Sequence, residues 1–347
     1  MNGIAHIVAR AVGDDPHTLA VLALADAMKS DEPAPVFASV SRERVAGVKA
    51  VSQLRAAKPA LLVYHQQGAA PALVSRLVER RLVERGTRLA VVHGDPRPDP
   101  IAQRDLQVLA GAGAVGVATS TRAESRLQDA GFERVSRVPP VVARDRLAAI
   151  DSYAPTSNHV AVALRGPLIL TVDDVATAAN AARVVQAYHV LRTYLVRAGH
   201  LAIEVPEIAD TSEPAFETIQ REIWGLRLVD AWAHRLAVVG ERAAYTRGAA
   251  VFVTADPASG DVRHALAAMA EGVPVVAVAD VSAASELDEG ALLLPPDSGA
   301  ALIAEAVADL LNDEARRSRL AAAASRTADR YAPEIVAPLW RAALAAA

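Results

Sequence analysis

The sequence predicts an α/β protein made of two Rossmann-like, doubly wound domains. Its 347 residues are more than a single hydrophobic core usually organises, so two domains are expected. Along the whole chain, short apolar runs rich in β-branched residues alternate with longer stretches of helical pattern. Apolar strands separated by amphipathic helices indicate a parallel sheet with helices on both faces, and two such sets indicate two sheets.

The first half of the chain contains a complete set of alternating strands and helices. Strands are expected at 4–8, 36–40, 61–63, 89–92 and 115–118. Helices are expected between them at 16–29, 42–57, 71–84 and 101–109. The Pro139-Pro140 pair and a polar stretch at 153–159 then interrupt the alternation. We therefore expect an N-terminal domain over 1–150.

The second half repeats the pattern. Strands are expected at 168–172, 201–205, 236–239, 251–254, 275–279 and 292–294, and the closing helices at 299–312, 314–330 and 333–344. The second domain is expected over 151–330, and 331–347 should form a C-terminal helix that could cross back to the first domain. Because doubly wound sheets bind ligands at the carboxyl ends of their strands, we expect both domains to face a central cleft.

Composition excludes several classes of function. A net charge of −4 and a pI near 6.2 leave no basic field that would attract nucleic acid. The absence of cysteine excludes disulfides and thiolate metal sites, and it fits the cytoplasm. Apolar stretches such as 19–28 contain charges like Asp26 and fall short of the roughly 18 residues that span a bilayer. The first residues lack the basic and apolar regions of a signal peptide.

The expected helix around 72–88 bears on membrane contact. It carries arginines that could touch anionic lipid at the inner face of the membrane: Arg76, Arg80, Arg81, Arg85 and Arg88. Glutamates are interleaved with these arginines, so a solvated helix with ion pairs is the favoured interpretation. We expect a cytoplasmic protein, with peripheral membrane contact as the weaker alternative.

Residues 251–296 form the most informative segment of the chain. Its core reads AMAEGVPVV from Ala268 to Val276, and it closes with LLPP from Leu293 to Pro296. This segment resembles the nucleotide-sugar half-site of glycosyltransferase family 4, whose members have the GT-B fold of two Rossmann-like domains. The resemblance extends over nearly the whole chain. It implies retaining transfer of a sugar from a nucleotide sugar to an acceptor, with no bound metal or other cofactor.

The loop within this segment also has a physical rationale. Gly260 permits a tight turn, and a helix starting near Val262 would present its free N–H groups to a ligand. A helix N-terminus carries roughly half a positive charge, which suits a diphosphate. We therefore expect donor contacts from Ser259, Gly260, Val262 and Arg263. Any β-loop-α turn of a Rossmann half has this geometry, so the surrounding motif carries the assignment.

The residues that the family uses for chemistry are largely missing. The family's two glutamates align with Ser259 and Ala267, and no glutamate lies between positions 241 and 271. Its Gly-Arg pair and lysine align with Asp173-Asp174 and Ala179. Each lost charge-assisted hydrogen bond is worth about 1.5–3 kcal/mol, so the ordinary mechanism with ordinary residues is not expected.

Other side chains could compensate for these losses. Arg183, on the helix after the two aspartates, and Arg263 are candidates for the donor diphosphate. Asp261 is a candidate for the sugar hydroxyls, and Glu286 resembles an acid of the loop after the PVV motif. The plainer interpretation of Arg183, Arg263 and Asp261 is a solvated helix residue. Glu286 could instead be an acid at a helix N-terminus.

The first domain offers three further candidates. His93 follows a predicted strand and resembles a family histidine that contacts the transferred sugar, although a structural histidine is an equal alternative. Gly13 and His17 lie in the first β-α loop, where the family approaches the acceptor with glycines; Gly13 is the only glycine there. No metal-ligand spacing of histidines, nucleophile elbow or phosphate-binding Walker loop is present.

Two hypotheses follow for function. The favoured one is a retaining hexosyltransferase with a remodelled donor site, acting on a nucleotide sugar and an unidentified acceptor. The alternative is a catalytically silent GT-B protein with a degenerate active site that binds a sugar or regulates a paralogous glycosyltransferase partner. The substitutions at Ser259, Ala267 and Ala179 favour the alternative, whereas Gly260 and the two-domain architecture favour the enzyme.

Overall fold

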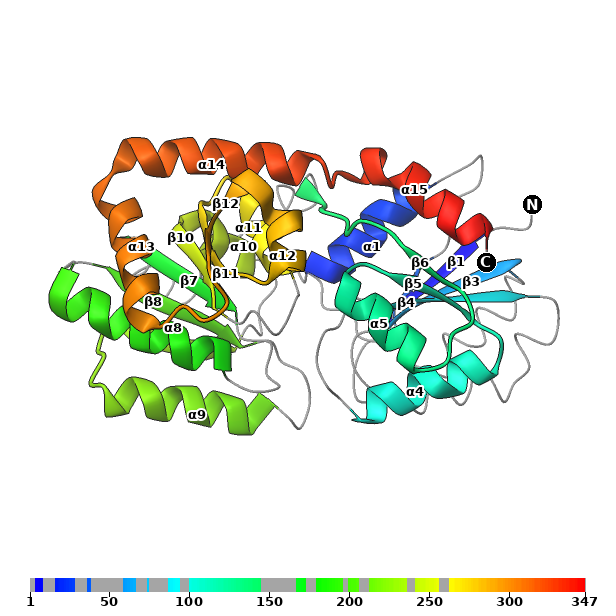
Figure 1. Ribbon diagram of the computed structural model, residues 1–347, viewed down its shortest axis with the longest axis horizontal. Helices are drawn as coiled ribbons and strands as arrows, with labels where there is room; N and C mark the ends of the chain where they lie inside the picture. Colours follow the sequence, from blue (N-terminus) through cyan, green and yellow to red (C-terminus); the bar gives the residue numbers. More distant parts are fainter. Residues whose placement is uncertain are drawn as a thin grey trace. The chain divides into compact units, whose positions relative to one another are not determined.

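The structure is a computed structural model that describes residues 4–8, 16–28, 36–38, 59–66, 74, 87–93, 100–144, 167–172, 179–195, 199–205, 212–235, 241–255 and 262–346. The chain forms two compact units (Figure 1). The N-terminal unit contains 1–143 together with 331–347, and the C-terminal unit contains 144–330.

A parallel six-stranded sheet forms the centre of the N-terminal unit. Its strands are β1 (Ile4–Val8), β2 (Val36–Ala38), β3 (Leu61–Gln66), β4 (Arg88–His93), β5 (Val115–Ala118) and β6 (Val135–Arg137), in the order β2-β1-β3-β4-β5-β6. All described pairs are parallel. This doubly wound order is the Rossmann-like arrangement that the apolar runs predicted.

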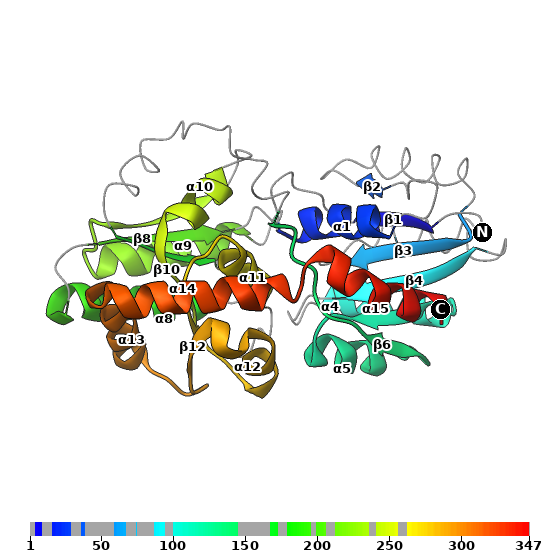
Figure 2. The ribbon, with the colours of Figure 1, turned by 90° about the horizontal axis from the view of Figure 1, so that it is seen from above.

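Helices cover both faces of this first sheet (Figure 2). On one face, α1 (Pro16–Ala27) and the C-terminal helix α15 (Pro333–Ala345) pack together with Leu24, Trp340 and Leu344 in the core. On the other face lie α4 (Pro100–Gly111) and α5 (Thr121–Asp129), which bury Leu106 and Leu127. The last helix of the chain therefore belongs to the core of the N-terminal unit.

A second parallel six-stranded sheet forms the centre of the C-terminal unit. Its strands are β7 (Leu168–Val172), β8 (His200–Val205), β9 (Ala231–Arg235), β10 (Ala249–Thr254), β11 (Val275–Val278) and β12 (Ala291–Leu294), in the order β12-β11-β10-β7-β8-β9. Strands β7 and β10 are neighbours although their last opposed pair, Leu170 and Phe252, is 82 positions apart in the sequence. The chain winds outward from β7 on one side and from β10 on the other, which makes this junction the switch point of the sheet.

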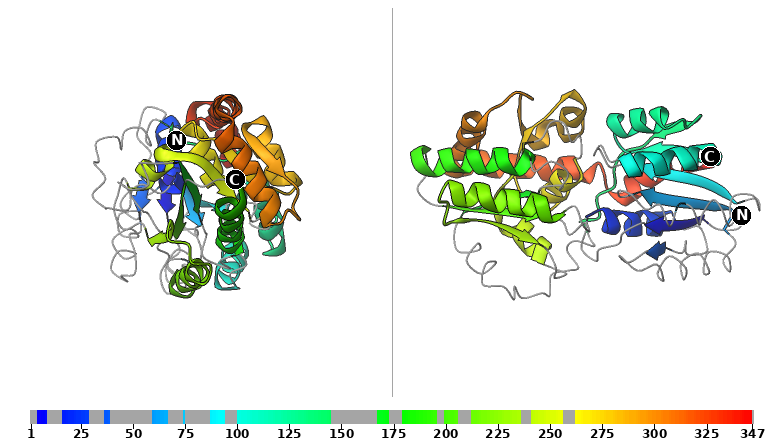
Figure 3. Two further views of the ribbon diagram at one scale, coloured as in Figure 1. Left: turned by 90° about the vertical axis from the view of Figure 1, so that its left-hand side faces the viewer. Right: turned by 90° about the horizontal axis from the view of Figure 1, so that it is seen from below.

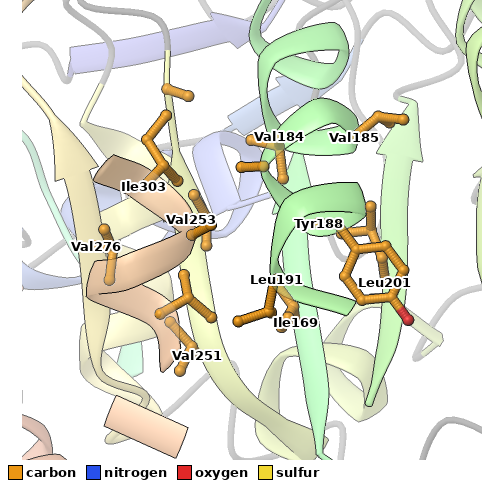
Figure 4. Packing of buried hydrophobic residues seen from close by; sticks show 14 of the residues in the cluster. Ile169, Val184, Val185, Tyr188, Leu191, Leu201, Val251, Val253, Val276 and Ile303 are labelled. Atoms are coloured by element: carbon orange, nitrogen blue, oxygen red, sulfur yellow. The ribbon is translucent and has the colours of Figure 1, made fainter. Parts of the chain in front are cut away.

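One face of the second sheet is covered by α8 (Ala179–Val190), the π-helix η1 (Leu191–Leu195), α9 (Ser212–Gly225) and α13 (Ala300–Asn312). The view from below in Figure 3 shows α8 beside α9 on this face. Figure 4 shows the side chains of Ile169 and Val253 packed among Val184, Tyr188 and Ile303.

The remaining helices of the C-terminal unit are α10 (Glu241–Gly248), α11 (Arg263–Ala270), α12 (Val281–Leu287), the 3₁₀ turn η3 (Asp288–Gly290) and α14 (Glu314–Asp329). Helix α11 packs on α14, and α14 also contacts β11 and β12. Within the described ranges, no helix is both long and apolar enough to cross a membrane.

Most predicted elements have their expected positions. The strands predicted at 4–8, 115–118 and 168–172 are confirmed with their bounds. Three predicted elements fall outside the described residues: the helices at 42–57 and 71–84 and the strand at 236–239. Within 71–84, the structure describes Val74. Strand β9 (Ala231–Arg235), at the edge of the sheet, was not predicted because its sequence AWAHR lacks a continuous apolar run.

Candidate functional site

The switch point of the second sheet lies between the carboxyl ends of β7 and β10. Leu170 pairs with Phe252 in parallel register, so the strands end side by side at Val172 and Thr254. The connections that leave these ends, 173–178 and 256–261, fall outside the described residues. Ligands of doubly wound sheets bind at this position, so the described side chains around it define the candidate site.

A buried polar network joins the two strand ends through the first turns of α8. Asn180 is 7% exposed, and its Oδ1 accepts a hydrogen bond from the backbone N–H of Ala255 at 2.6 Å. Its Nδ2 donates to Oγ1 of the fully buried Thr171 at 3.2 Å. One turn further along α8, Nη1 of Arg183 donates to the backbone carbonyl of Ala255 at 3.0 Å. Both backbone groups of Ala255 are thus held by side chains of α8.

These contacts place Arg183 at the predicted edge of the sheet. Its guanidinium is partly buried and lies against the residue that follows β10. The side chain is therefore not a solvated residue on the outside of the helix. A guanidinium has several further N–H donors, so one bond to Ala255 is compatible with a second, anionic partner.

Helix α11 begins at Arg263, where the sequence predicted a helix start near Val262. Its N-cap Val262 is buried and apolar, so this residue has no side-chain oxygen with which to cap the first N–H groups. Arg263 in the first turn is partly buried and interacts with other groups. Ala267, at a family glutamate position, is 8% exposed and belongs to the packed face of the helix.

The carboxyl end of α11 is held by two arginines that sequence reasoning did not single out. Nε of Arg144 donates to the backbone carbonyl of Ala270 at 2.9 Å, while its other nitrogens bond to Asp329 and Ser325 of α14. Glu271, the C-cap, forms an ion pair with Arg247 at 3.1 Å. Burial raises the pKa of Glu271, and the positive charges of Arg247 and Arg144 oppose that rise.

The other predicted donor residues are placed only in part. Glu286 is 7% exposed and lies in the last turn of α12, so it is a buried carboxylate rather than a helix N-terminal acid. Asp280 is the residue that caps this helix, because its Oδ1 accepts from the N–H of Ala283. Ser259, Gly260 and Asp261 lie in 256–261, outside the described residues.

The predicted residues of the N-terminal unit are placed by backbone alone. His93 is the last residue of β4, opposite Gln66 of β3 and Ala118 of β5 in register. His17 lies in the first turn of α1. Gly13 and the greater part of the arginine-rich segment 72–88 fall outside the described residues. Among the predicted side chains that the structure describes, Arg183 is placed at the switch point by a hydrogen bond.

A second buried polar cluster lies on the sheet of the N-terminal unit. Nδ1 of His6 lies 3.0 Å from Nε2 of His65, and both rings are almost fully buried. The ring of His65 stacks near that of Trp340 on α15, whose indole N–H donates to the carbonyl of Pro139 at 3.0 Å. Burial lowers the pKa of His6 to about 4, so the His6 imidazole is neutral at pH 7.

Sequence reasoning missed Asn180, Arg144 and the histidine pair. Asn180 adjoins Ala179, the position of the family lysine, and it is a polar residue within the small-residue stretch ATAANAA, which is a weak signal. Arg144 carries no local signal because its partners are up to 185 residues away. Across the described residues, no group of three or more His, Asp or Glu side chains is arranged to hold a metal ion.

No protein-family model matches the sequence, and neither does any curated protein. Solved structures do match along the full length. The trehalose 6-phosphate synthase of Burkholderia multivorans has 15% identity and a TM-score of 0.68, with 100% of this chain and 99% of that chain covered. Anabaena HepE in complex with UDP and glucose has 13% identity and a TM-score of 0.68, with 99% and 100% covered.

A glycosyltransferase from Rickettsia africae has 11% identity and a TM-score of 0.66, with 99% of this chain and 97% of that chain covered. At such identities the likeness establishes the fold and nothing finer. Two parallel doubly wound sheets in one chain, matched over its whole length by these proteins, are the GT-B architecture that the sequence predicted. The chain therefore has the GT-B fold.

Proposed function

We propose that this chain is a glycosyltransferase, resembling family 4, that transfers a sugar with retention from a nucleotide sugar to an acceptor. The observation that carries the proposal is the full-length match to a glycosyltransferase from Rickettsia africae, to a trehalose 6-phosphate synthase and to HepE, whose structure holds UDP and glucose. The sequence motif from Ala268 to Val276 supports the same donor class. A cysteine-free sequence is the ground for proposing a cytoplasmic site of action.

In this proposal the donor binds at the switch point of the C-terminal unit. Arg183, the amino end of α11 and Arg263 stabilise the diphosphate, which accumulates charge as the sugar departs. Asp261 is assigned to the sugar hydroxyls, and His93, the last residue of β4, is assigned to the transferred sugar. Positioning and electrostatic stabilisation supply the rate enhancement, so no bound metal is required. The support from the structure is the contact of Arg183 with Ala255.

A silent, ligand-binding protein is the second candidate. It is favoured by Ala267, which places a buried methyl group where the family has a glutamate. Asp173 and Asp174 also add negative charge after β7, where the family has Gly-Arg. Such a protein would bind a sugar or a partner without turnover.

Calorimetric titration with UDP, GDP and dTDP and their common sugars tests the donor site. We expect a dissociation constant on the order of micromolar for one nucleotide. Removing a charge-assisted bond in Arg183→Ala or Arg263→Ala should weaken binding about tenfold or more. Arg192→Ala is the matched control. Arg192 lies in η1, which continues α8, and its guanidinium pairs with Asp230 rather than with Ala255.

The outcomes separate the two candidates. If none of the nucleotides binds at millimolar concentration, the proposal of a nucleotide-sugar transferase is wrong. Binding that survives both arginine substitutions would remove the remodelled donor site. Slow hydrolysis of a UDP-sugar to UDP and free sugar, with water taking the place of the acceptor, supports an enzyme. Tight binding with neither hydrolysis nor transfer to varied acceptors supports the silent protein.

A further inference from the structure

We propose that Asn180 is a positioning residue that sets where the donor-side loop after β10 begins. The proposal rests on the proposed function, because it assigns to Asn180 a role in nucleotide affinity through Ala255. Asn180 itself need not touch the ligand. It acts by holding the residue from which 256–261 and then α11 follow.

Side chains satisfy both backbone groups of Ala255, at the end of a parallel strand. Ala255 comes directly after β10 and is 1% exposed, so its N–H and carbonyl are shielded from water. A buried backbone group without a partner costs free energy, and at most strand ends the ladder or water supplies the partner. Here Oδ1 of Asn180 and Nη1 of Arg183 supply both partners, at 2.6 and 3.0 Å.

Asn180 is in turn fixed from the other strand. Its Nδ2 donates to Oγ1 of Thr171, the second-last residue of β7, at 3.2 Å. An amide side chain can donate and accept at the same time, so one residue links the ends of β7 and β10. Both connections that flank the switch point therefore start from strand ends that Asn180 joins.

In the proposed donor site, this arrangement holds Ala255 in place although the family's lysine is missing. Ala179 stands where the family has a lysine, and the next residue along α8 is Asn180. The lysine position no longer offers a charge, yet the adjacent position holds the loop through neutral hydrogen bonds. Arg183, one turn further along α8, donates to the carbonyl of the same residue, Ala255. It is the arginine of α8 that lies beside this network.

The test combines hydrogen exchange of the Ala255 amide, read by NMR, with calorimetric titration of UDP. In Asn180→Ala the Ala255 amide should exchange at least about tenfold faster, and UDP should bind about tenfold more weakly. Thr171→Val removes the acceptor of Nδ2 but leaves Oδ1 for Ala255. Because Thr171 fixes Asn180, this variant should accelerate the exchange of the Ala255 amide and weaken UDP binding, each by less than Asn180→Ala does.

Val184→Ala is the control for simple loss of stability, because Val184 is a buried core residue of the same helix. It should lower the melting temperature without changing UDP affinity well below that temperature. Asn180→Asp retains the acceptor for Ala255, so it should restore slow exchange if the hydrogen bond is the cause.

The failure of each idea has its own signature. If Asn180→Ala leaves the exchange of Ala255 unchanged, or accelerates it while UDP affinity is unaffected, the positioning role is overturned. If Val184→Ala weakens UDP binding as much as Asn180→Ala does, the effect is one of stability and the role is again overturned. If the unsubstituted protein binds no nucleotide, the proposed function fails, while acceleration of exchange still supports the anchoring of Ala255 by Asn180.

Discussion

Each unit of the protein buries a polar network on its central sheet, and these two networks differ in place and chemistry. In the N-terminal unit, His6 and His65 lie on the sheet face that α1 and α15 cover. In the C-terminal unit, Asn180 and Thr171 lie at the carboxyl ends of the central strands. The first network consists of imidazole rings, and the second of an amide and a hydroxyl beside the guanidinium of Arg183.

The difference shows what a buried polar group can stabilise. The histidine pair lies beneath α15 and next to Trp340, so it contributes to the packing of this C-terminal helix on the sheet of its own unit. At the strand ends, the amide holds a loop residue and so bears on a binding site. The histidine network should make the N-terminal unit sensitive to acid, whereas the amide network adds no titratable group. The following predictions test this contrast.

The largest effect is expected at Trp340, which is 2% exposed in the core under α15. Trp340→Ala removes a large buried side chain and the hydrogen bond to Pro139, so the unfolding free energy of the N-terminal unit should fall by about 3–5 kcal/mol. Chemical denaturation followed by circular dichroism measures this loss.

Trp224→Ala is the matched control for this substitution. Trp224 is 73% exposed on α9 of the C-terminal unit, and its removal should change stability by less than about 0.5 kcal/mol. Equal losses in the two variants would contradict the assignment of α15 to the core of the N-terminal unit.

The next effect is an acid-dependent loss of stability caused by His6. Its pKa in the folded protein is about 4, against an ordinary value of 6.5. Above pH 6.5 the imidazole is neutral in both states and contributes nothing to the pH dependence. Between pH 6.5 and 4 the unfolded chain binds a proton that the folded chain does not, so stability falls as the pH falls.

The size of this loss is roughly 3 kcal/mol at about 1.4 kcal/mol per pH unit, and it is complete near pH 4. His6→Gln removes the titrating group, so the variant should lose that much less stability than the unsubstituted protein between pH 7 and pH 4. Urea denaturation at a series of pH values measures the difference. Parallel pH profiles for the two proteins would show that the histidine pair is not the acid-sensitive element.

The contrast also shows which parts of the fold could be predicted. The buried strands β1, β5 and β7 are short and predominantly apolar, and such runs mark strands covered on both faces. The edge strand β9 and the short helix α5 were not predicted. Helix α5 is rich in charged and polar residues and buries only Ala123 and Leu127, which is too few to establish a helical period.

The candidate site was predictable where it is local in sequence. Helix α11 was located because its residues and the strand after it form one continuous motif. The Asn180 network depends on bringing α8 to Ala255, 75 residues away, and no local pattern carries that information. The same holds for His6 and His65, which are 59 residues apart. Polar residues in apolar segments are signals for such networks, but their partners become evident only in the fold.

The smallest effects are expected at the N-caps of one helix in each unit. Ser120 caps α5 by accepting from the N–H of Ala123 at 3.1 Å, and Asp280 caps α12 by accepting from the N–H of Ala283 at 2.9 Å. Replacing either residue by alanine should cost about 1 kcal/mol. Ser120→Ala should shift only the unfolding of the N-terminal unit and Asp280→Ala only that of the C-terminal unit, as measured by hydrogen exchange of core amides in each sheet. A loss of protection that spreads equally through both sheets would mean that the units unfold as one cooperative body, and the acid sensitivity caused by His6 would then reach the candidate site as well.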